Sequence, residues 1–162
     1  MYIEFIEATD NQLVEVQRLA HYIWPQVFNE ILSMDQLDYM LKLIYSEEAL
    51  IQQKQSGQTF ILLKNDNRFV GYIAYQVFTD KTKIHKLYLV PEMHGKGIGK
   101  LMLDYVVKIV DSIPQQTIYL NVNKYNKAKQ FYENYGFKVV ADEIIDIGNG
   151  YIMDDYVMEY RK

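Results

Sequence analysis

The feature that most constrains the fold is a strand-like segment that runs through a glycine-rich turn directly into an apolar helix. The segment spans Lys86–Lys100 and has glycines at positions 95, 97 and 99. The first four backbone N–H groups of a helix have no partner within it, and they lie at the positive end of the helix dipole. Glycines at every second position keep side chains away from these donors. The turn is therefore predicted to bind an anion, and a pyrophosphate is the group that fits it.

Two better-known phosphate loops conflict with this sequence. A P-loop requires glycine at position 94 and serine or threonine at 101, where the chain has His94 and Leu101. A dinucleotide-binding turn requires its third glycine at position 100, which is Lys100, and it lies within a βαβ unit. A glycine-rich turn that only connects a strand to a helix stays open as the alternative.

Periodicity and turn residues divide the chain into a helical first part and a strand-rich second part. In the first part we expect a strand over 3–8, a helix over 11–24 that ends at Pro25, a helix capped by Ser33, and a helix capped by Ser46 that ends before Gly57. In the second part we expect strands over 59–64, 69–79 and 83–90, a helix over 97–111, a strand over 117–122, a helix over 126–135, and strands over 137–146 and 151–159. This order predicts a mixed sheet with helices on both faces. The 162 residues are predicted to form a single domain over 1–162.

The composition excludes several kinds of protein and mechanism. The chain has no cysteine, which excludes disulfides, cysteine-rich zinc sites and an acyl-cysteine intermediate, so an acyl group would pass directly from carrier to acceptor. A net charge of −4 argues against a nucleic-acid partner. No apolar run approaches the roughly 20 residues that span a bilayer, and Glu4 interrupts an N-terminus that does not read as a signal peptide. We expect a cytoplasmic protein without a membrane partner.

Two motifs together resemble those of the GNAT (Gcn5-related N-acetyltransferase) family. The stretch Val90–Gly99 is similar to the family's acetyl-CoA motif, Q/R-x-x-G-x-G/A, with Gly97 and Gly99 as the glycine pair and His94 in place of the usual glutamine or arginine. The stretch Asn121–Phe137 resembles the family's second signature, which ends in F-Y-x-x-x-G-F. The two motifs stand in the family's order and are separated as the family requires.

The resemblance implies a fold, a cofactor and a subfamily. It implies the GNAT fold, of α/β (α+β) class, with a mixed, mostly antiparallel sheet of about seven strands and helices on both faces. It also implies acetyl-CoA as the cofactor. Three further stretches resemble bacterial PaiA-like polyamine acetyltransferases: Asp146–Met158, Trp24–Pro25 and Tyr39–Leu41.

The resemblance also implies two catalytic residues. In the family, the tyrosine of the second signature faces the sulfur of coenzyme A, so Tyr132 is expected to donate a proton to the departing thiolate. The alternative is that Tyr132, like Phe131 and Tyr135, only forms the aromatic face of a helix. Family members often place a glutamate or histidine in the strand before the turn, so His85 is the candidate base. A solvent-facing or capping histidine is the alternative there.

Most of the predicted cofactor contacts follow the same resemblance. The backbone of the strand at 87–89 is expected to pair with the pantetheine arm, and two asparagines are expected to reach its amides. The turn binds the pyrophosphate, and nearby lysines are candidates for phosphate contact. The full predicted set is Leu87, Tyr88, Leu89, His94, Gly95, Lys96, Gly97, Ile98, Gly99, Lys100, Asn123, Asn126, Lys129 and Tyr132.

The acceptor site is less well defined by the sequence. The first helices are expected to form its wall, with Trp24, Met34, Tyr39 and Met40 as candidates and plain core burial as the alternative. An acidic residue should face a cationic amine, and Glu4, Glu30, Glu92 and Asp155 stay open. No metal site is proposed.

The predicted function is transfer of an acetyl group from acetyl-CoA directly to a primary amine of a small molecule, with a polyamine as the candidate. The alternatives are a protein N-terminal or lysine acetyltransferase, and a low-turnover acyl-CoA-binding sensor. A homodimer is compatible with the family resemblance.

Overall fold

The computed structural model describes residues 1–115 and 117–162, and its strands form one mixed sheet. The strands are β1 (Ile3–Glu7), β2 (Thr59–Asn65), β3 (Arg68–Val77), β4 (Thr82–Leu89), β5 (Thr117–Asn123), β6 (Lys138–Gly148) and β7 (Tyr151–Arg161). Their order across the seven-stranded sheet is β1-β2-β3-β4-β5-β7-β6. Only β4 and β5 pair in parallel, and the other neighbours are antiparallel. The predicted mixed, mostly antiparallel sheet is confirmed.

Helices cover both faces of this sheet, as predicted. They are α1 (Leu13–Phe28), α2 (Met34–Tyr45), α3 (Glu47–Gln55), α4 (Ile98–Asp111) and α5 (Ala128–Tyr135). Tyr72 and Tyr88 are paired across β3 and β4, and they contact rings from α1 and α2 on one face. Phe5 lies in the neighbouring cross-strand row, so it faces the other way, and it stacks on Tyr105 of α4. The side chain of Phe131 lies against Gly99, which places α5 beside α4.

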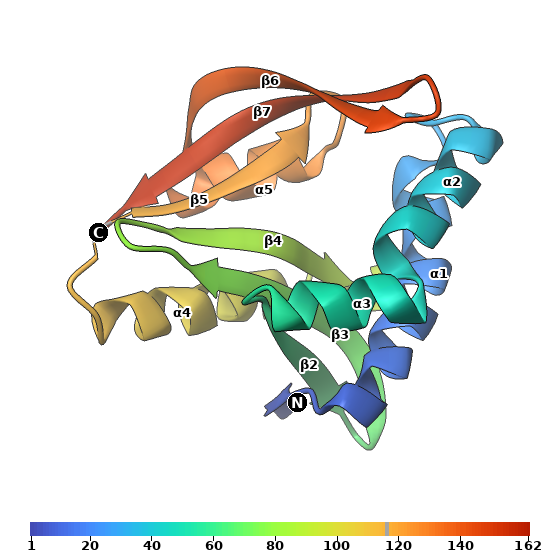
Figure 1. Ribbon diagram of the computed structural model, residues 1–162. Helices are drawn as coiled ribbons and strands as arrows, with labels where there is room; N and C mark the ends of the chain where they lie inside the picture. The colour runs from blue at the N-terminus through green and yellow to red at the C-terminus, as the bar shows by residue number, and fades with distance from the viewer. Residues whose placement is uncertain (116) are drawn as a thin grey trace.

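The two halves of the sheet separate between β4 and β5. The parallel pairing joins only residues 82–84 of β4 to residues 118–120 of β5. Beyond Ile84 the two strands diverge, and Figure 1 shows them close together near the chain's C-terminus and apart at the other end. A β-bulge precedes the separation, because Ile84 pairs with Tyr75 while Lys86 pairs with Ala74, which leaves His85 without a partner. A bulge at such a point re-aims the strand, so the free edge of β4 turns toward the gap.

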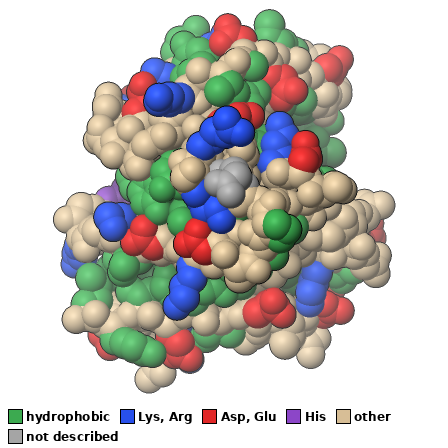
Figure 2. All heavy atoms as spheres, turned by 90° about the vertical axis from the view of Figure 1, so that its left-hand side faces the viewer, with side chains coloured by type: hydrophobic (Ala, Val, Ile, Leu, Met, Phe, Trp, Pro, Cys, Tyr) green, Lys and Arg blue, Asp and Glu red, His purple; other side chains and the backbone are tan. Residues whose placement is uncertain are grey.

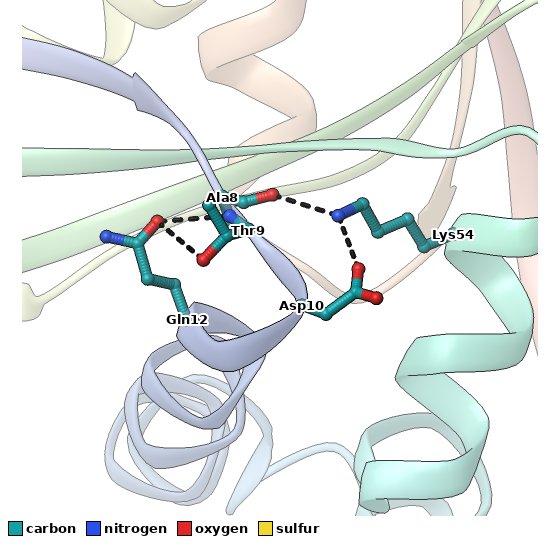
Figure 3. Close-up of polar contacts among 5 residues, drawn as sticks. All are labelled: Ala8, Thr9, Asp10, Gln12 and Lys54. Carbon is teal, nitrogen blue, oxygen red and sulfur yellow. Dashed lines mark hydrogen bonds and ion pairs between the residues drawn. The ribbon is translucent and has the colours of Figure 1, made fainter.

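The start of α1 is held by contacts with two other elements. The Thr9 backbone N–H donates to Oε1 of Gln12 at 3.0 Å. Lys54 of α3 donates to the Ala8 carbonyl and forms an ion pair with Asp10 at 2.6 Å (Figure 3). These bonds satisfy groups at the helix entry and connect the ends of β1 and α3 to α1.

The predicted end of the first helix at Pro25 is wrong. Pro25 lies inside α1, which continues to Phe28. A proline within a helix costs about 3 kcal/mol through the lost hydrogen bond and the ring clash. Here the side chains of Trp24 and Phe28 are both buried and in contact with each other, so packing on either side of the proline keeps the helix intact. The other boundaries that were predicted agree with the structure to within two residues.

The hairpin of β6 and β7 is fixed to α2. The Tyr39 hydroxyl donates to the Ile147 carbonyl at 2.7 Å, and the Gln36 amide donates to the Ile152 carbonyl at 2.9 Å. Tyr39 also packs its ring against Tyr151, with the ring centroids 5.4 Å apart. The hairpin therefore extends from the second half of the sheet to the helices that cover the first half.

Candidate active site

A deep cleft opens where β4 and β5 diverge. Its volume is about 1140 Å³, which exceeds the roughly 300–1000 Å³ of ordinary small-molecule pockets. Its walls come from α1, α2, β4, β5, the β6–β7 hairpin, the glycine-rich turn and the first turns of α4 and α5. The cleft is therefore large enough for a nucleotide-bearing ligand and a second, smaller substrate together.

The glycine-rich turn has the free donors that an anion requires. Within the described chain, the backbone N–H groups of residues 95–100 find no acceptor, and the first to do so is that of Leu101, which donates to the Gly97 carbonyl. Gly95 and Gly97 have φ angles of 76° and 80°, which residues with a Cβ rarely adopt. A Cβ on Gly99 would lie 3.0 Å from the Phe131 ring. The glycines thus give the turn its shape and let α5 pack closely, and the exposed donors fit a pyrophosphate.

The free edge of β4 leads from this turn into the cleft. Leu87, Tyr88 and Leu89 all line the cleft, and none of them pairs with β5. His94 lines it as well, and its Nε2 lies 3.0 Å from the Leu89 carbonyl. An extended arm such as pantetheine can add to a strand edge of this kind through backbone hydrogen bonds. The prediction that residues 87–89 contact the cofactor stays a prediction, and their placement supports it.

Tyr132 of α5 also lines the cleft. Its side chain is buried and packs between Phe131 and Phe137. Burial raises the pKa of Tyr132 well above the ordinary tyrosine value. The phenol therefore stays protonated at neutral pH and is able to donate a proton.

His85, the candidate base, lies at the bulge of β4 and lines the cleft. Its Nε2 lies 3.0 Å from Oε1 of Gln76, so Nε2 carries the hydrogen and Nδ1 is the free acceptor. Burial, and after it the charges of Lys83 and Lys86, lower the pKa of His85 to about 3. An imidazole with this pKa is neutral at pH 7 and is a weak proton acceptor. Its role as base stays a prediction.

The other predicted cofactor residues divide into two groups. Asn123, Asn126 and Lys100 line the cleft, whereas Lys96, Ile98 and Lys129 do not. Both asparagines use their side-chain oxygens locally: that of Asn123 accepts from the backbone of residue 125, and that of Asn126 accepts from the backbone of residue 128 at the start of α5. Their amide NH₂ groups are the parts left for a ligand.

Two of the four predicted acceptor-site residues lie in the cleft wall. Trp24 and Met40 line it, but Met34 and Tyr39 do not. Met34 is 79% exposed because it is the first residue of α2 and lies on the helix's solvent side. Tyr39 instead fastens α2 to the β6–β7 hairpin. The helical spacing that suggested these residues gives their position along the helix but not the direction in which the cleft lies.

The four acidic residues that were candidates to face a cationic acceptor differ in whether they line the cleft. Glu30 and Asp155 line the cleft, whereas Glu4 and Glu92 do not. Asp155 is only 6% exposed, and its Oδ1 is buried without a hydrogen-bond partner. Burial is the main cause that raises the pKa of Asp155 above the ordinary value, and the Asn121 amide opposes this rise.

Lys86 is a cleft residue that the sequence analysis did not single out. It is 6% exposed, and its Nζ donates to Oε1 of Gln53 at 2.6 Å and of Gln58 at 3.0 Å. Burial, and after it the charge of Lys83, lower the pKa of Lys86 to about 7. Both glutamines are distant from Lys86 in sequence, so no local signal could have predicted this environment.

Comparison with known proteins gives the family. Residues 10–158 match the acetyltransferase (GNAT) domain. The chain belongs to the GNAT family of N-acetyltransferases. As a GNAT enzyme it uses acetyl-CoA, and the free donors of the glycine-rich turn fit the pyrophosphate of that cofactor. The prediction of an acetyltransferase is confirmed.

Relatives of this GNAT protein act on more than one kind of amine. It is 26% identical to the spermidine N(1)-acetyltransferase of Thermoplasma acidophilum over 160 residues, which are 95% of this chain and 97% of that protein. It is 28% identical to the ribosomal protein bS18-alanine N-acetyltransferase of Haemophilus influenzae over 141 residues, 85% of this chain and 82% of that protein. The enzyme is therefore an acetyltransferase that acts on amines.

Solved structures confirm the GNAT fold. The PaiA N-acetyltransferase of Thermoplasma acidophilum, solved in complex with coenzyme A, has a TM-score of 0.83 and 27% identity, with 100% of each chain covered. A GCN5-related N-acetyltransferase from Rhodopseudomonas palustris has a TM-score of 0.85 at 14% identity, with 100% of this chain and 97% of the other covered. The resemblance to PaiA-like enzymes in the sequence is thus confirmed as well.

Charges of both signs are mixed on one face of the molecule. On the face shown in Figure 2, Lys and Arg side chains are interspersed with Asp and Glu, without a large patch of one sign. In the part of the chain that the structure describes, no helix has both the length and the apolar character needed to cross a membrane. A homodimer and a cytoplasmic location stay predictions.

Proposed function

We propose that this GNAT enzyme acetylates a primary amine of a small molecule, with polyamines as the substrate class. The observation that carries the proposal is the connection between α2 and the β6–β7 hairpin, two elements that both line the cleft. Hydrogen bonds from Tyr39 and Gln36 join α2 to the hairpin. This connection limits the space on that side of the cleft, which favours a small amine over a protein substrate that requires an open groove. The name of the Thermoplasma relative, a spermidine acetyltransferase, supports the same class.

The reaction requires two proton transfers that the chain must assist, one from the amine and one to the departing sulfur. An alkyl amine has a pKa near 10.4, so freeing its lone pair at pH 7 costs about 4–5 kcal/mol. The site must accept that proton, and it must also supply one to the sulfur that leaves. Acetyl-CoA supplies the thioester carbonyl that the amine attacks. With no cysteine in the chain, the acetyl group moves directly to the amine.

Tyr132 is the proposed proton donor. It lines the cleft on the α5 side, next to the turn that holds the pyrophosphate, and burial keeps its phenol protonated by raising its pKa. The backbone of β4 positions the thioester, since its free edge runs between this turn and the bulge at His85. A backbone N–H on that edge is suited to hold the carbonyl oxygen as it gains negative charge.

The test is the variant Tyr132→Phe, which removes only the hydroxyl. We expect kcat with spermidine to fall about 100-fold or more, the usual range for loss of a general acid, while the dissociation constant of coenzyme A measured by calorimetry changes less than about threefold. Tyr135→Phe is the matched control, because that hydroxyl is on the same helix but bonds to Asp104 outside the cleft. An unchanged kcat in Tyr132→Phe would refute the assigned role.

Wild-type turnover with different acceptors tests the substrate class. Spermidine, spermine and putrescine are compared with an amino-terminal peptide and a lysine peptide at equal concentration. Higher kcat/KM for the peptides would overturn the proposal in favour of a protein acetyltransferase. Binding of acetyl-CoA without turnover of any amine would favour a sensor.

A further inference from the structure

Asp155 presents an unexplained carboxylate in the cleft. It lies on β7, is 6% exposed and lines the cleft. Its Oδ1 is buried and has no hydrogen-bond partner in the described chain. Its Oδ2 has only a 3.4 Å contact with the amide nitrogen of Asn121, and that nitrogen makes a much shorter bond, 2.6 Å, to Glu143. Native proteins rarely leave a buried oxygen unpaired, so this one requires an explanation.

The neighbouring charges do not neutralise Asp155. Within the described residues no Lys, Arg or His nitrogen lies within ion-pair distance of its carboxylate. The charged and titratable groups that face it are Lys83 and Tyr88 from β4, Glu143 from β6 and its neighbour Asp154. Of these only Lys83 is cationic, and its effect on Asp155 ranks last. A buried carboxylate without a counter-ion destabilises a fold, so Asp155 is suited to pair with a cation from outside the chain.

The sheet register places Asp155 on the acceptor side of the cleft. Asp155 pairs with Asn123 of β5 and Glu143 of β6, so these three side chains share one face of the sheet. The same face carries Met153, whose sulfur lies 3.8 Å from the Gln36 amide of α2. Residues at alternate positions point the other way: Asp154 pairs with Lys124 on the opposite face.

Tyr132 approaches the cleft from that opposite face. Its ring contacts Phe137, which in turn contacts Tyr160, a residue in the same alternate row of β7 as Asp154. The cleft thus has a protonated phenol on one side of the sheet and a buried carboxylate on the other. An acetyl donor held between β4 and β5 would have its sulfur toward the first and its attacked carbonyl open toward the second.

We propose that Asp155 binds the ammonium group of the acceptor and accepts its proton, and that Glu143 binds a second cationic group of the same molecule at the rim. This inference rests on the proposed function. It identifies the two contacts by which the site would select a di- or polyamine over a monoamine. Glu143 is exposed, and it is connected to Asp155 through the shared Asn121 amide. Glu143 does not itself line the cleft, but Asn121, to which it is bonded, does. One buried carboxylate in the cleft and one exposed carboxylate beside it match two ammonium groups along an alkyl chain.

The proton and electron balance is complete with these groups. The ammonium gives one proton to Asp155, and the nitrogen lone pair then forms the C–N bond to the acetyl carbonyl carbon. The C–S bond breaks with its electron pair on sulfur, which receives a proton from Tyr132. The amide nitrogen loses its second proton to solvent, and the tyrosinate takes one proton back from solvent. Asp155 then releases its proton to solvent, so both residues return to their starting forms, one proton is released per turnover, and no oxidant or reductant is needed.

The primary test is Asp155→Asn, which keeps the shape and removes the charge. The matched control is Asp154→Asn, the same substitution one residue away on the opposite face. Spermidine is titrated calorimetrically into protein saturated with coenzyme A, a complex that does not turn over. We expect Asp155→Asn to weaken spermidine binding by at least about 30-fold, as loss of one partner from a buried charge pair does, and Asp154→Asn to change it less than about threefold.

Two further readouts separate this role from a structural one. If the role of Asp155 is to bind the acceptor and not to stabilise the fold, Asp155→Asn should raise the Tm of the ligand-free protein at pH 8. The expected increase is about 2–4 °C, because the substitution removes an unpaired buried charge. A structural aspartate would give a lower Tm instead. Burial raises the pKa of Asp155 above the ordinary aspartate value. Spermidine binding by the wild type should therefore weaken as the pH is lowered and Asp155 becomes protonated, and this dependence should be lost in Asp155→Asn.

Glu143→Gln tests the second contact. It should weaken spermidine binding several-fold and leave binding of butylamine, which has a single ammonium, within about twofold. Equal losses for both amines would overturn the rim contact.

The two levels of proposal fail in different ways. Wild-type enzyme that binds coenzyme A but acetylates no small amine would overturn the proposed function. Wild-type enzyme that acetylates spermidine, together with an Asp155→Asn variant of unchanged spermidine affinity and unchanged kcat, would overturn only the role of Asp155.

Discussion

The burial of Lys86 predicts how strongly the folding stability of the protein depends on pH. The side chain is 6% exposed and is held by two glutamine oxygens without a carboxylate. Burial lowers the pKa of Lys86 to about 7, against 10.5 for the free side chain. This difference corresponds to about 5 kcal/mol of folding free energy at low pH. The stability of the wild type should therefore depend on pH. We expect Lys86→Met, which removes the charge and keeps a long unbranched side chain, to abolish this pH dependence.

The sign of the change in stability with pH follows from whether the folded or the unfolded state keeps the proton on Lys86. Between pH 7 and 10.5 the unfolded chain keeps a proton on Lys86 that the folded protein has released, so wild-type stability rises with pH in this window. Below pH 7 both states are protonated and the destabilisation is at its maximum. From pH 7 to pH 9.5 the wild type should gain about 3 kcal/mol relative to Lys86→Met.

Urea unfolding at pH 7, 8, 9 and 9.5 measures this difference for the two proteins. Lys108→Met is the matched control, because it makes the same substitution at an exposed lysine of α4. A stability difference between wild type and Lys86→Met that stays constant within about 0.5 kcal/mol over this range would show that Lys86 titrates normally, and the argument from burial would then be wrong.

Three other substitutions test separate parts of the structure. Gly97→Ala should weaken coenzyme A binding about tenfold in calorimetry, because a residue with a Cβ at a φ of 80° costs about 1–2 kcal/mol and reshapes the turn; unchanged affinity would refute the role of the turn. Tyr72→Phe should lower the free energy of unfolding by about 1–2 kcal/mol, since its hydroxyl bonds to that of Tyr45 at 2.7 Å in the core, and the double variant with Tyr45→Phe should lose less than the sum of the two single changes. His85→Gln should leave the pH dependence of kcat/KM between pH 6 and 8 unchanged, since burial lowers the pKa of His85 to about 3 and the imidazole is neutral throughout that range; loss of an inflection near pH 6.5 would contradict this and restore His85 as the base.

Local signals in the sequence were sufficient for nearly all of the helices and strands and for the conformation of the glycine-rich turn. The strand, glycine-rich turn and helix around residues 86–100 are contiguous in the chain, so neighbouring residues determine their conformation. Tyr132 was predicted from the resemblance of residues 121–137 to a family motif, and the structure places it in the cleft wall, while its role stays a prediction. Ser33 and Ser46 were predicted as helix caps, and each accepts a backbone N–H at the start of its helix.

Where prediction failed, the deciding partner was distant in the chain. Helix α1 passes Pro25 because Trp24 before it and Phe28 after it are buried, and the ring of Trp24 packs on Tyr45 and Tyr88 from distant elements. Tyr39 was expected in the acceptor pocket, but its hydroxyl bonds instead to residue 147 of the hairpin. Helical periodicity shows that a side chain is on the buried side of its helix, and it cannot show whether a core, a cleft or another element lies there.

The sequence by itself determined the order of helices and strands, the glycine-rich turn before α4, and the absence of a cysteine intermediate. Only the tertiary structure decided which carboxylates line the cleft, which of them is buried there, and which lysine is buried in its wall. The physical reason is that burial and charge pairing depend on groups brought together from distant parts of the chain. Asp155 was one of four equal candidates until the register of β5, β6 and β7 placed it in the cleft without a partner.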